Sequence, residues 1–240
     1  MPASTVKSAE IARFDALAAR WWDPNGPMRA LHRMNPARIE WICRQIARAF
    51  PGGAHLRILD VGCGAGLAAE ALARRGFDVL GIDAAADAIA AAVAHAKDQG
   101  AVGPRLSARY RVAAPEDLAA EGERFPVITA LEVIEHVADA GRFLSALAAL
   151  LEPGGLLLLS TLNRTPQSFV AAKIAAEYVL RWLPVGTHNW RRFLTPAELA
   201  SALRRAGLRP IEVTGLRMEP GGRWRTGGST AVNYLIAARR

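Results

Sequence analysis

Residues 57–66 read R-I-L-D-V-G-C-G-A-G, and this stretch decides the fold. Its first half is a short apolar run typical of a buried parallel strand. Gly62, Gly64 and Gly66 follow at every second position, and a helical pattern begins near Leu67. A strand, a glycine loop and a helix together present backbone N–H groups and a helix N-terminus to a ligand. The stretch therefore predicts a ligand site at the end of the first strand of an α/β sheet.

The spacing of the glycines separates two classes of cofactor. A dinucleotide fingerprint needs G-x-G-x-x-G. Its third glycine would fall at Leu67 when counted from Gly62, and at Ala69 when counted from Gly64. From Asp60 the sequence reads D-x-G-x-G-x-G instead, which resembles the S-adenosylmethionine (SAM) loop of class I methyltransferases. A glycine-rich turn that binds nothing is the alternative.

A second strand, expected over 77–82, supports a nucleoside site because it ends at Asp83. An acidic residue at this strand tip can accept hydrogen bonds from ribose hydroxyls. Sites for NAD share that feature, so Asp83 by itself does not identify the cofactor. The glycine spacing favours SAM.

Composition indicates one domain over residues 1–240, with N-terminal helices over 1–50 and a helical insertion over 163–192. The chain is 51% hydrophobic and has no run of 18 apolar residues, so we expect no transmembrane segment and no secretory signal. A disulfide at Cys63, inside the glycine loop, would obstruct a ligand. With only Cys43 as a second cysteine, a reduced, cytoplasmic setting is favoured.

Charge suggests anionic partners but not nucleic acid. The net charge is +8, and nearly all of the basic residues are arginines. A basic surface attracts nucleic acid or anionic lipid. The arginines are scattered, however, and no long basic run is interleaved with aromatic residues. We therefore expect no nucleic-acid partner.

The periodicity of apolar residues predicts a doubly wound, mostly parallel, seven-stranded sheet. In the second predicted helix, Pro36 suits the first turn and Asn35 suits the cap. A capping box at 195–198 starts the last helix. The helices are expected over 8–22, 36–50, 67–75, 84–99, 140–151 and 195–205, and the strands over 58–61, 77–82, 107–112, 125–131, 156–161, 210–216 and 232–238.

The insertion interrupts this alternation with a predicted helix over 166–183. Lys173, Glu177 and Arg181 form one charged line along it, and nearly all other positions are apolar. So wide an apolar arc is either packed under an active-site lid or faces something apolar, such as a membrane whose anionic headgroups contact the flanking arginines. Both interpretations remain open.

Two other features also have two interpretations. Trp21 and Trp22 precede a loop rich in Pro and Gly, and they are either core residues or the lid of an apolar pocket. Glu116 and Asp117 follow the third predicted strand, where they either reach an adenine or are solvated loop charges.

A cluster of polar residues follows the fourth predicted strand, in L-E-V-I-E-H-V at 131–137. Ligands of open α/β sheets bind at the carboxyl ends of the strands, so Glu132, Glu135 and His136 should share an edge with the glycine loop. They can bind a divalent cation or supply a general base, and His136 is the catalytic candidate. Either role would favour the phenolate of an aromatic acceptor. A solvated turn with a packing histidine is the alternative.

Several stretches of the chain resemble the ubiquinone-biosynthesis O-methyltransferase family. The glycine loop is common to the whole superfamily, whereas R-W-W-D, L-H-R-x-N-P-x-R and S-T-L-N-R are much more particular. The matching stretches are F-D-A-L-A-A-R-W-W-D (14–23), L-H-R-M-N-P-A-R (31–38), L-D-V-G-C-G-A-G (59–66), L-E-V-I-E-H-V (131–137), S-T-L-N-R (160–164), A-E-Y-V-L-R (176–181), G-T-H (186–188) and V-N-Y (232–234).

The resemblance implies a SAM-dependent O-methyltransferase that acts on phenolic hydroxyls of polyprenylated catechol or quinol intermediates. It implies SAM contacts at Arg38 and Leu131, besides Gly62 and Asp83, and a Mg²⁺ site formed by Glu132, Glu135 and His136. The Arg38 guanidinium would pair with the methionine carboxylate of SAM.

The long prenyl tails of such substrates imply a peripheral protein on the inner face of a bacterial membrane, with other ubiquinone-biosynthesis enzymes as partners. Two alternatives remain: a SAM-dependent methyltransferase acting on RNA, protein or another small phenol, and a non-catalytic protein that binds SAM or a nucleotide.

Overall fold

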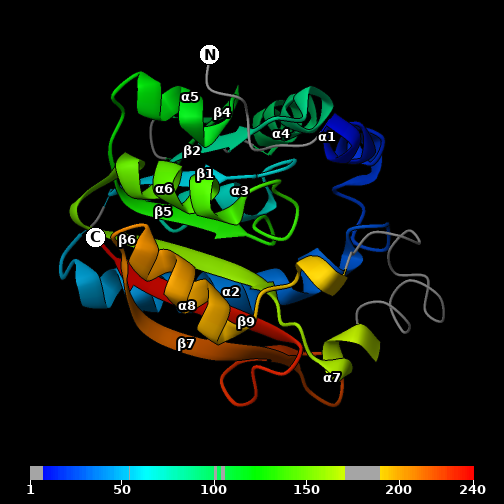
Figure 1. Cartoon of the computed structure of the whole chain (residues 1–240). Coiled ribbons are helices and arrows are strands. Elements are labelled where there is room, and N and C mark those ends of the chain that lie inside the picture. The colour runs from blue at the N-terminus through cyan, green and yellow to red at the C-terminus, as the bar shows by residue number, and fades with distance from the viewer. Residues whose placement is uncertain (1–7, 54, 100–101, 104–105, 171–189) are drawn as a thin grey trace.

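A computed structural model of the chain describes residues 8–53, 55–99, 102–103, 106–170 and 190–240. One sheet runs through it in the order β3-β4-β2-β1-β5-β6-β9-β7-β8 (Figure 1). Its strands are β1 Arg57–Val61, β2 Asp78–Asp83, β3 Val102–Gly103, β4 Leu106–Val112, β5 Phe125–Leu131, β6 Leu151–Leu162, β7 Arg209–Met218, β8 Trp224–Thr226 and β9 Asn233–Arg239.

The α-helices mostly alternate with the strands, as expected for a doubly wound fold. Among the described residues they are α1 Ser8–Asp15, α2 Arg29–Ala49, α3 Leu67–Ala73, α4 Ala86–Asp98, α5 Pro115–Ala120, α6 Ala140–Leu150, α7 Pro166–Ser168 and α8 Pro196–Arg205, with 3-10 turns η1 Ala18–Arg20 and η3 Trp190–Arg192. None of the described helices is long and apolar enough to cross a membrane.

Strand directions confirm the predicted fold class. β1 lies between β2 and β5 and is parallel to both, and β6 continues the parallel set. β9 is antiparallel to both β6 and β7. The strand order reverses on either side of β1, which places the carboxyl ends of β1, β2 and β5 around a topological switch point. Ligands of open α/β sheets bind there.

The predicted count of seven strands is wrong, because the described residues alone form a sheet of nine. The two additional strands, β3 and β8, are two and three residues long and pair with β4 and β7 in antiparallel hairpins. Such short segments contain too few residues for an alternating pattern to be visible in the sequence.

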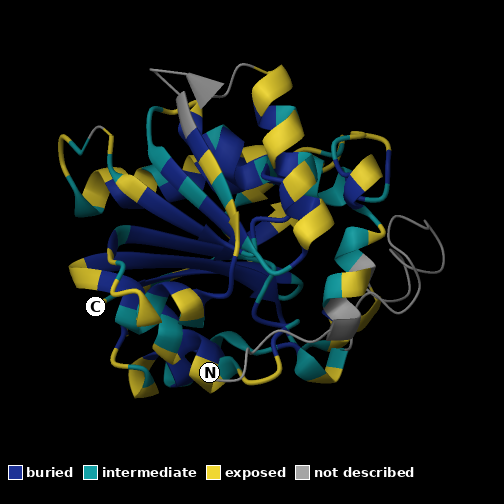
Figure 2. Ribbon diagram, turned by 90° about the horizontal axis from the view of Figure 1, so that it is seen from above, coloured by how far each residue is buried: buried dark blue, intermediate teal, exposed yellow. Residues whose placement is uncertain are grey.

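Two hydrophobic cores cover the two faces of the sheet. The core on one face includes Phe143 from α6 and Leu199 from α8, and the core on the other includes Ile42 from α2 and Leu72 from α3. All four side chains are at most 1% exposed. Figure 2 shows the central strands as a buried layer between these helices.

The second helix begins earlier than the sequence pattern predicts. α2 begins at Arg29, seven residues before the predicted start, so Pro36 lies inside the helix and Asn35 does not cap it. Asn35 is buried, and its Nδ2 donates to the carbonyl oxygen of Leu67, 3.0 Å away. A proline normally interrupts a helix, but packing of this buried helix against α3 outweighs that local preference.

Two other predicted boundaries also change. The helix over 8–22 is divided into α1 and η1. β6 begins at Leu151 rather than at 156, so Pro153, Gly154 and Gly155 lie inside the strand. The pairing register with β5 shifts at this point, which accommodates the additional residues as an irregularity.

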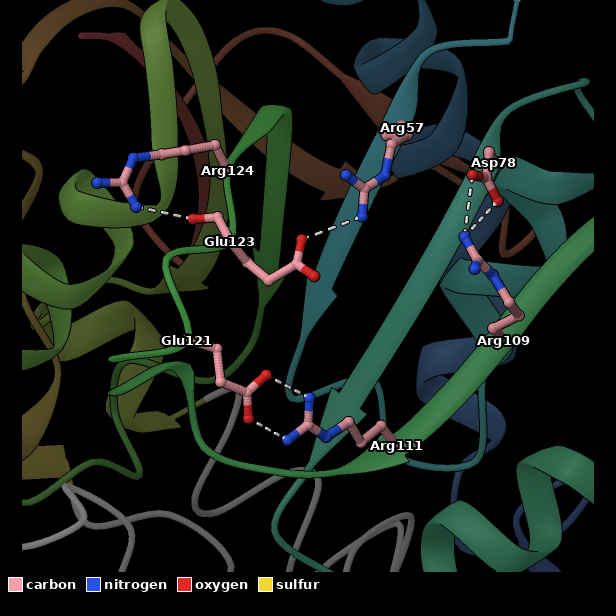
Figure 3. Close-up of polar contacts among 7 residues, drawn as sticks. All are labelled: Arg57, Asp78, Arg109, Arg111, Glu121, Glu123 and Arg124. Atoms are coloured by element: carbon pink, nitrogen blue, oxygen red, sulfur yellow. Dashed lines mark hydrogen bonds and ion pairs between the residues drawn. The ribbon is translucent and has the colours of Figure 1, made fainter. Parts of the chain in front are cut away.

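Ion pairs on the β1–β2–β4 side of the sheet neutralise several arginines. These side chains are largely exposed, so each pair contributes little to stability. Part of the positive charge is nevertheless paired locally rather than free to form a basic patch. The pairs are Arg57–Glu123, Arg109–Asp78 and Arg111–Glu121 (Figure 3).

Candidate active site

The glycine loop adopts a backbone conformation that requires its glycines. Gly62, Gly64 and Gly66 have φ angles of 68°, 53° and 88°, in the left-handed region that side chains disfavour. The N–H groups of Gly62 and Cys63 donate to the Ile82 carbonyl oxygen at 2.8 and 3.1 Å, which ties the loop to β2. Gly66 is the N-cap residue of α3. The predicted strand, loop and helix are therefore confirmed.

Close neighbours also exclude side chains from the loop. A Cβ built on Gly62 would lie 2.5 Å from Val133, and one built on Gly64 would lie 2.2 Å from the ring of Trp21. A Cβ on Gly66 would lie 2.4 Å from the Tyr110 hydroxyl. Each glycine therefore faces a different part of the chain.

Asp83 connects the second strand to this loop. Its Oδ2 accepts a hydrogen bond from the Gly64 N–H, and its Oδ1 accepts one from the Ala85 N–H, each at 2.9 Å. Burial raises the pKa of Asp83, and these backbone donors oppose the shift. A carboxylate has further acceptor sites, so its predicted contact with ribose hydroxyls remains compatible with these bonds.

Asp60 is a buried carboxylate at the end of β1, 2% exposed. Its Oδ1 accepts a hydrogen bond from Thr129 Oγ1 at 2.7 Å, while Oδ2 has no hydrogen-bond partner among the described residues. Burial raises its pKa to about 6, although the Thr129 hydroxyl and the charge of Arg38 counteract that rise.

Arg38 is a buried guanidinium on α2, 3% exposed. Its Nη2 donates to Asn35 Oδ1 at 3.3 Å, and its Nε has no acceptor among the described residues. Burial lowers the pKa of Arg38, whereas the charges of nearby Glu132, Asp60 and Glu135 raise it. The structure thus brings Arg38 together with the residues that follow β5.

Glu132 follows β5 directly and has a φ of 58°, an uncommon value for a residue with a side chain. Its N–H donates to the Ser160 carbonyl oxygen at 2.9 Å, and its Oε1 accepts from Ser160 Oγ at 2.7 Å. Both bonds hold the carboxylate against β6. Strained conformations of this kind are concentrated at functional sites.

Glu135 is 4% exposed, and its Oε2 accepts from Thr161 Oγ1 at 2.9 Å. Its Oε1 has no hydrogen-bond partner in the described part of the chain. Burial and the charge of Glu132 raise its pKa to about 7, and His136 opposes the rise. The predicted solvated glutamate is therefore wrong for Glu135.

Sequence reasoning missed the supporting hydroxyls of Ser160 and Thr161. Their signal is a pair of hydroxyl residues at the end of an otherwise apolar strand, L-L-L-L-S-T. Both are buried.

His136 and Leu131 lie at the same edge of the sheet. The His136 ring is half-buried and meets the Phe14 ring edge-on, with centroids 5.5 Å apart. Leu131 ends β5 and is half-buried. The structure thus gathers the predicted site residues from β1, β2, β5 and α2 around one edge.

The donor chemistry of this cluster fits a divalent cation, since two carboxylates lie close together and Glu135 Oε1 is unsatisfied. As the side chains lie, however, no three His, Cys, Asp or Glu residues among those described form a group that could hold a metal ion. Binding of a metal by Glu132, Glu135 and His136 would need a rearrangement.

Glu116 and Asp117 now have different assignments. Asp117 Oδ2 accepts from the Ala114 N–H at 2.9 Å, which caps α5. Both carboxylate oxygens of Glu116 are shielded from solvent and have no hydrogen-bond partner among the described residues. Glu116 therefore retains the capacity to bind a ligand, whereas Asp117 serves the helix.

The predicted helix over 166–183 lies mostly outside the described residues, including Lys173, Glu177 and Arg181. Its described beginning, α7 and the two residues after it, places Phe169 and Val170 at the surface, 39% and 55% exposed.

Comparison with known proteins gives the family. The family described as "Methyltransferase domain" matches residues 31–213. "Ubiquinone biosynthesis O-methyltransferase" of Cereibacter sphaeroides is 46% identical over 99% of this chain and 98% of its own length. The protein of that name from Azorhizobium caulinodans is 45% identical over 98% of this chain and 94% of its own. This chain belongs to the ubiquinone biosynthesis O-methyltransferase family.

Solved structures of proteins that are less similar in sequence share the fold. Magnesium protoporphyrin IX methyltransferase from Synechocystis PCC 6803, with bound SAH, superimposes with a TM-score of 0.66 at 21% identity, covering 96% of this chain and 99% of its own. The [4+2]-cyclase SpnF superimposes with a TM-score of 0.59 at 17% identity, covering 84% and 80%. At these identities the likeness concerns the fold alone.

The buried carboxyl of Asp60 predicts a pH-dependent stability of this methyltransferase. Its pKa of about 6 in the folded chain exceeds the ordinary 3.8. Its contribution to stability is therefore complete below about pH 4 and lost as the pH rises through 6. Asp60→Asn removes this loss, so the free energy of unfolding of the variant minus that of the wild type should rise by about 2 kcal/mol between pH 4.5 and 7.5.

Urea denaturation at the two pH values measures this difference. Asp78→Asn is the control, because Asp78 forms a partly exposed pair with Arg109. A pH-independent difference for Asp60→Asn would contradict the prediction.

Proposed function

We propose that this protein transfers the methyl group of SAM to phenolic hydroxyls of polyprenylated catechol or quinol intermediates in ubiquinone biosynthesis. One observation carries the proposal beyond family membership: a buried cluster of incompletely paired polar groups lies beside the glycine loop. Buried polar groups in native proteins are nearly always satisfied. Arg38, Asp60 and Glu135 each retain a buried atom that has no hydrogen-bond partner among the described residues, and so does Glu116 on α5. These atoms support a polar ligand.

The cofactor contacts follow from these groups. The unpartnered Nε of Arg38 suits the carboxylate of SAM. Asp83, at the tip of β2, suits the ribose hydroxyls. The two free oxygens of Glu116 suit the amino group of adenine. Asp60, Gly62, Gly64, Gly66 and Leu131 complete the proposed cofactor site.

His136 is the proposed general base for the acceptor phenol. An imidazole that accepts the phenolic proton becomes positively charged, and the adjacent Glu135 carboxylate, held by Thr161, would stabilise that charge. Fixing the acceptor oxygen in line with the methyl group would supply much of the remaining rate enhancement.

Mg²⁺ held by Glu132, Glu135 and His136 is the alternative way of forming the phenolate at this site, because a His136 nitrogen that binds the metal would not also accept the phenolic proton. A bound divalent cation lowers the pKa of a coordinated hydroxyl and so favours the phenolate. The support is the proximity of two carboxylates whose charges repel each other.

A peripheral position on the inner face of a bacterial membrane is also part of the proposal. Polyprenylated substrates reside in lipid, and other enzymes of the pathway would be partners there. The exposed Phe169 and Val170 support contact of the segment 166–183 with that surface.

The methyl-transfer reaction gives the main test. With labelled SAM and a short-chain demethylubiquinol, His136→Asn should lower kcat by roughly 10²–10⁴-fold, because a general base is lost. His55→Asn, at an exposed residue, is the matched control and should retain full activity. Total RNA serves as the competing acceptor. Labelling of RNA but not of the quinol would refute the proposed substrate.

A second prediction concerns the metal. If Mg²⁺ takes part, EDTA should inhibit the wild type strongly, and added Mg²⁺ should restore turnover. The double variant E132Q/E135Q should have low activity that neither treatment changes, because its carboxylate ligands are absent. Full, chelator-insensitive turnover of this variant would exclude the metal role.

A third prediction concerns the membrane. Val170→Asp places a negative charge on the proposed contact surface, so sedimentation with anionic vesicles should weaken roughly fivefold. Val93→Asp is the matched control, because Val93 on α4 is similarly exposed, at 49% against 55% for Val170. Equal wild-type binding to neutral and anionic vesicles would rule out the electrostatic contribution.

A further inference from the structure

The N-terminal segment 14–28 lies against the glycine loop and the candidate base. We call it the N-terminal cover. Phe14 touches His136 edge-on, and its ring centroid lies 6.1 Å from that of Trp21. Trp21 is 5% exposed, and its ring faces Gly64 so closely that a Cβ there would be 2.2 Å away. Trp21 thus packs against the middle glycine of the loop.

Trp22 fastens the cover to the scaffold. Its Nε1 donates to the Ala65 carbonyl oxygen at 3.0 Å, and its ring stacks on His95 with a centroid distance of 3.3 Å. His95 Nδ1 is hydrogen-bonded to Glu70 Oε1 at 2.7 Å, and Glu70 is fully buried. Glu70 Oε2 also pairs with Arg74, at 2.8 Å. This chain of contacts joins the cover to α3 and α4.

Two more bonds fix the cover at either side of Trp21. Asp15 Oδ1 accepts from the Asp87 N–H, in the first turn of α4, at 2.9 Å. His32 Nε2 is hydrogen-bonded to the Trp21 carbonyl oxygen at 2.8 Å. The position of the Trp21 ring is therefore determined by several independent contacts.

The indole N–H groups of the tryptophans differ in whether they have a hydrogen-bond acceptor. Trp22, Trp41 and Trp190 each donate to an oxygen, at 3.0, 2.8 and 3.0 Å. Trp21 Nε1 is buried and has no hydrogen-bond acceptor among the described residues. An unsatisfied buried donor is costly. A tryptophan that only filled the core would be expected to pair its N–H, as Trp41 does with Glu212.

We propose that Trp21 is a cofactor-binding residue, whose indole N–H donates to an oxygen of SAM and whose ring, packed against Gly64, forms one wall of the cofactor site. Trp22 is a positioning residue that holds Trp21 in place through His95. The acceptor is a carboxylate or ribose oxygen, because these are the oxygen-bearing groups of SAM. This inference rests on the proposed function only in taking SAM as the cofactor.

Calorimetric titration with SAH tests the inference without any methyl acceptor. Trp21→Phe keeps an aromatic ring and removes the N–H donor, so SAH should bind about tenfold more weakly. The thermal midpoint of the unliganded Trp21→Phe variant should fall less than that of Trp41→Phe, because both lose the same ring volume but the Trp21 N–H has no acceptor among the described residues. Trp41→Phe is the matched control: it breaks a bond to Glu212, so its thermal midpoint should fall while its SAH affinity is unchanged.

Two further readouts separate binding from structural support. SAH should change the tryptophan fluorescence of the wild type and of Trp41→Phe, and should change it much less in Trp21→Phe. In turnover assays, Trp21→Phe should raise the KM for SAM and leave the KM for the phenolic acceptor unchanged. Trp22→Phe breaks the bond to Ala65, and it should also weaken SAH binding.

Each outcome decides the inference. If the wild type binds SAH and Trp21→Phe binds equally well or more tightly, the role of Trp21 is refuted while the proposed function stands. If the wild type binds no SAH, both proposals fail. A tenfold loss confined to Trp21→Phe and Trp22→Phe, with Trp41→Phe unaffected, supports the inference.

Discussion

The burial of one guanidinium among several carboxylates constrains the rest of this structure. Arg38 is 3% exposed, and the charges of Asp60, Glu132 and Glu135 surround it. Buried charges are costly unless they are paired and hydrogen-bonded. Hydroxyls on β5 and β6 supply part of that bonding, while Arg38 Nε, Asp60 Oδ2 and Glu135 Oε1 have no hydrogen-bond partner among the described residues. Their cost is tolerable only if something else meets them, which is why we regard this edge as a binding site rather than as a defect in the core.

This constraint explains why a sheet that starts at residue 57 needs the helices that precede it in the chain. Arg38 reaches the carboxyl edge from α2, which packs on one face through Ile42 and anchors itself through Asn35. A helix begun at Pro36 would place Arg38 in its first, frayed turn. Starting at Arg29 instead gives Arg38 about two and a half turns of preceding helix, at the cost of a proline inside it.

Short sequence motifs correctly predicted the features that depend on local backbone geometry. The glycine loop, Asp83 at a strand tip and the capping box at Thr195 all appear in the structure where the sequence placed them, because backbone geometry and strand order determine them. Other features depend on tertiary contacts. The start of α2 and the hydroxyl support of Glu135 arise from partners distant in the sequence, and no periodicity shows them. The metal site, the membrane contact and the roles of individual cofactor residues remain predictions.

The glycine loop of this methyltransferase is enclosed by side chains from three separate parts of the chain. The fold also occurs in a [4+2]-cyclase, so the sheet and its glycines do not determine a reaction. Here Val133, Trp21 and Tyr110 each close on a different glycine. Val133 belongs to the stretch that carries His136, and Trp21 to the R-W-W-D stretch that Trp22 fastens to Ala65. The R-W-W-D stretch and the stretch that carries His136 therefore both contact the glycine loop, although they are more than 100 residues apart in the sequence.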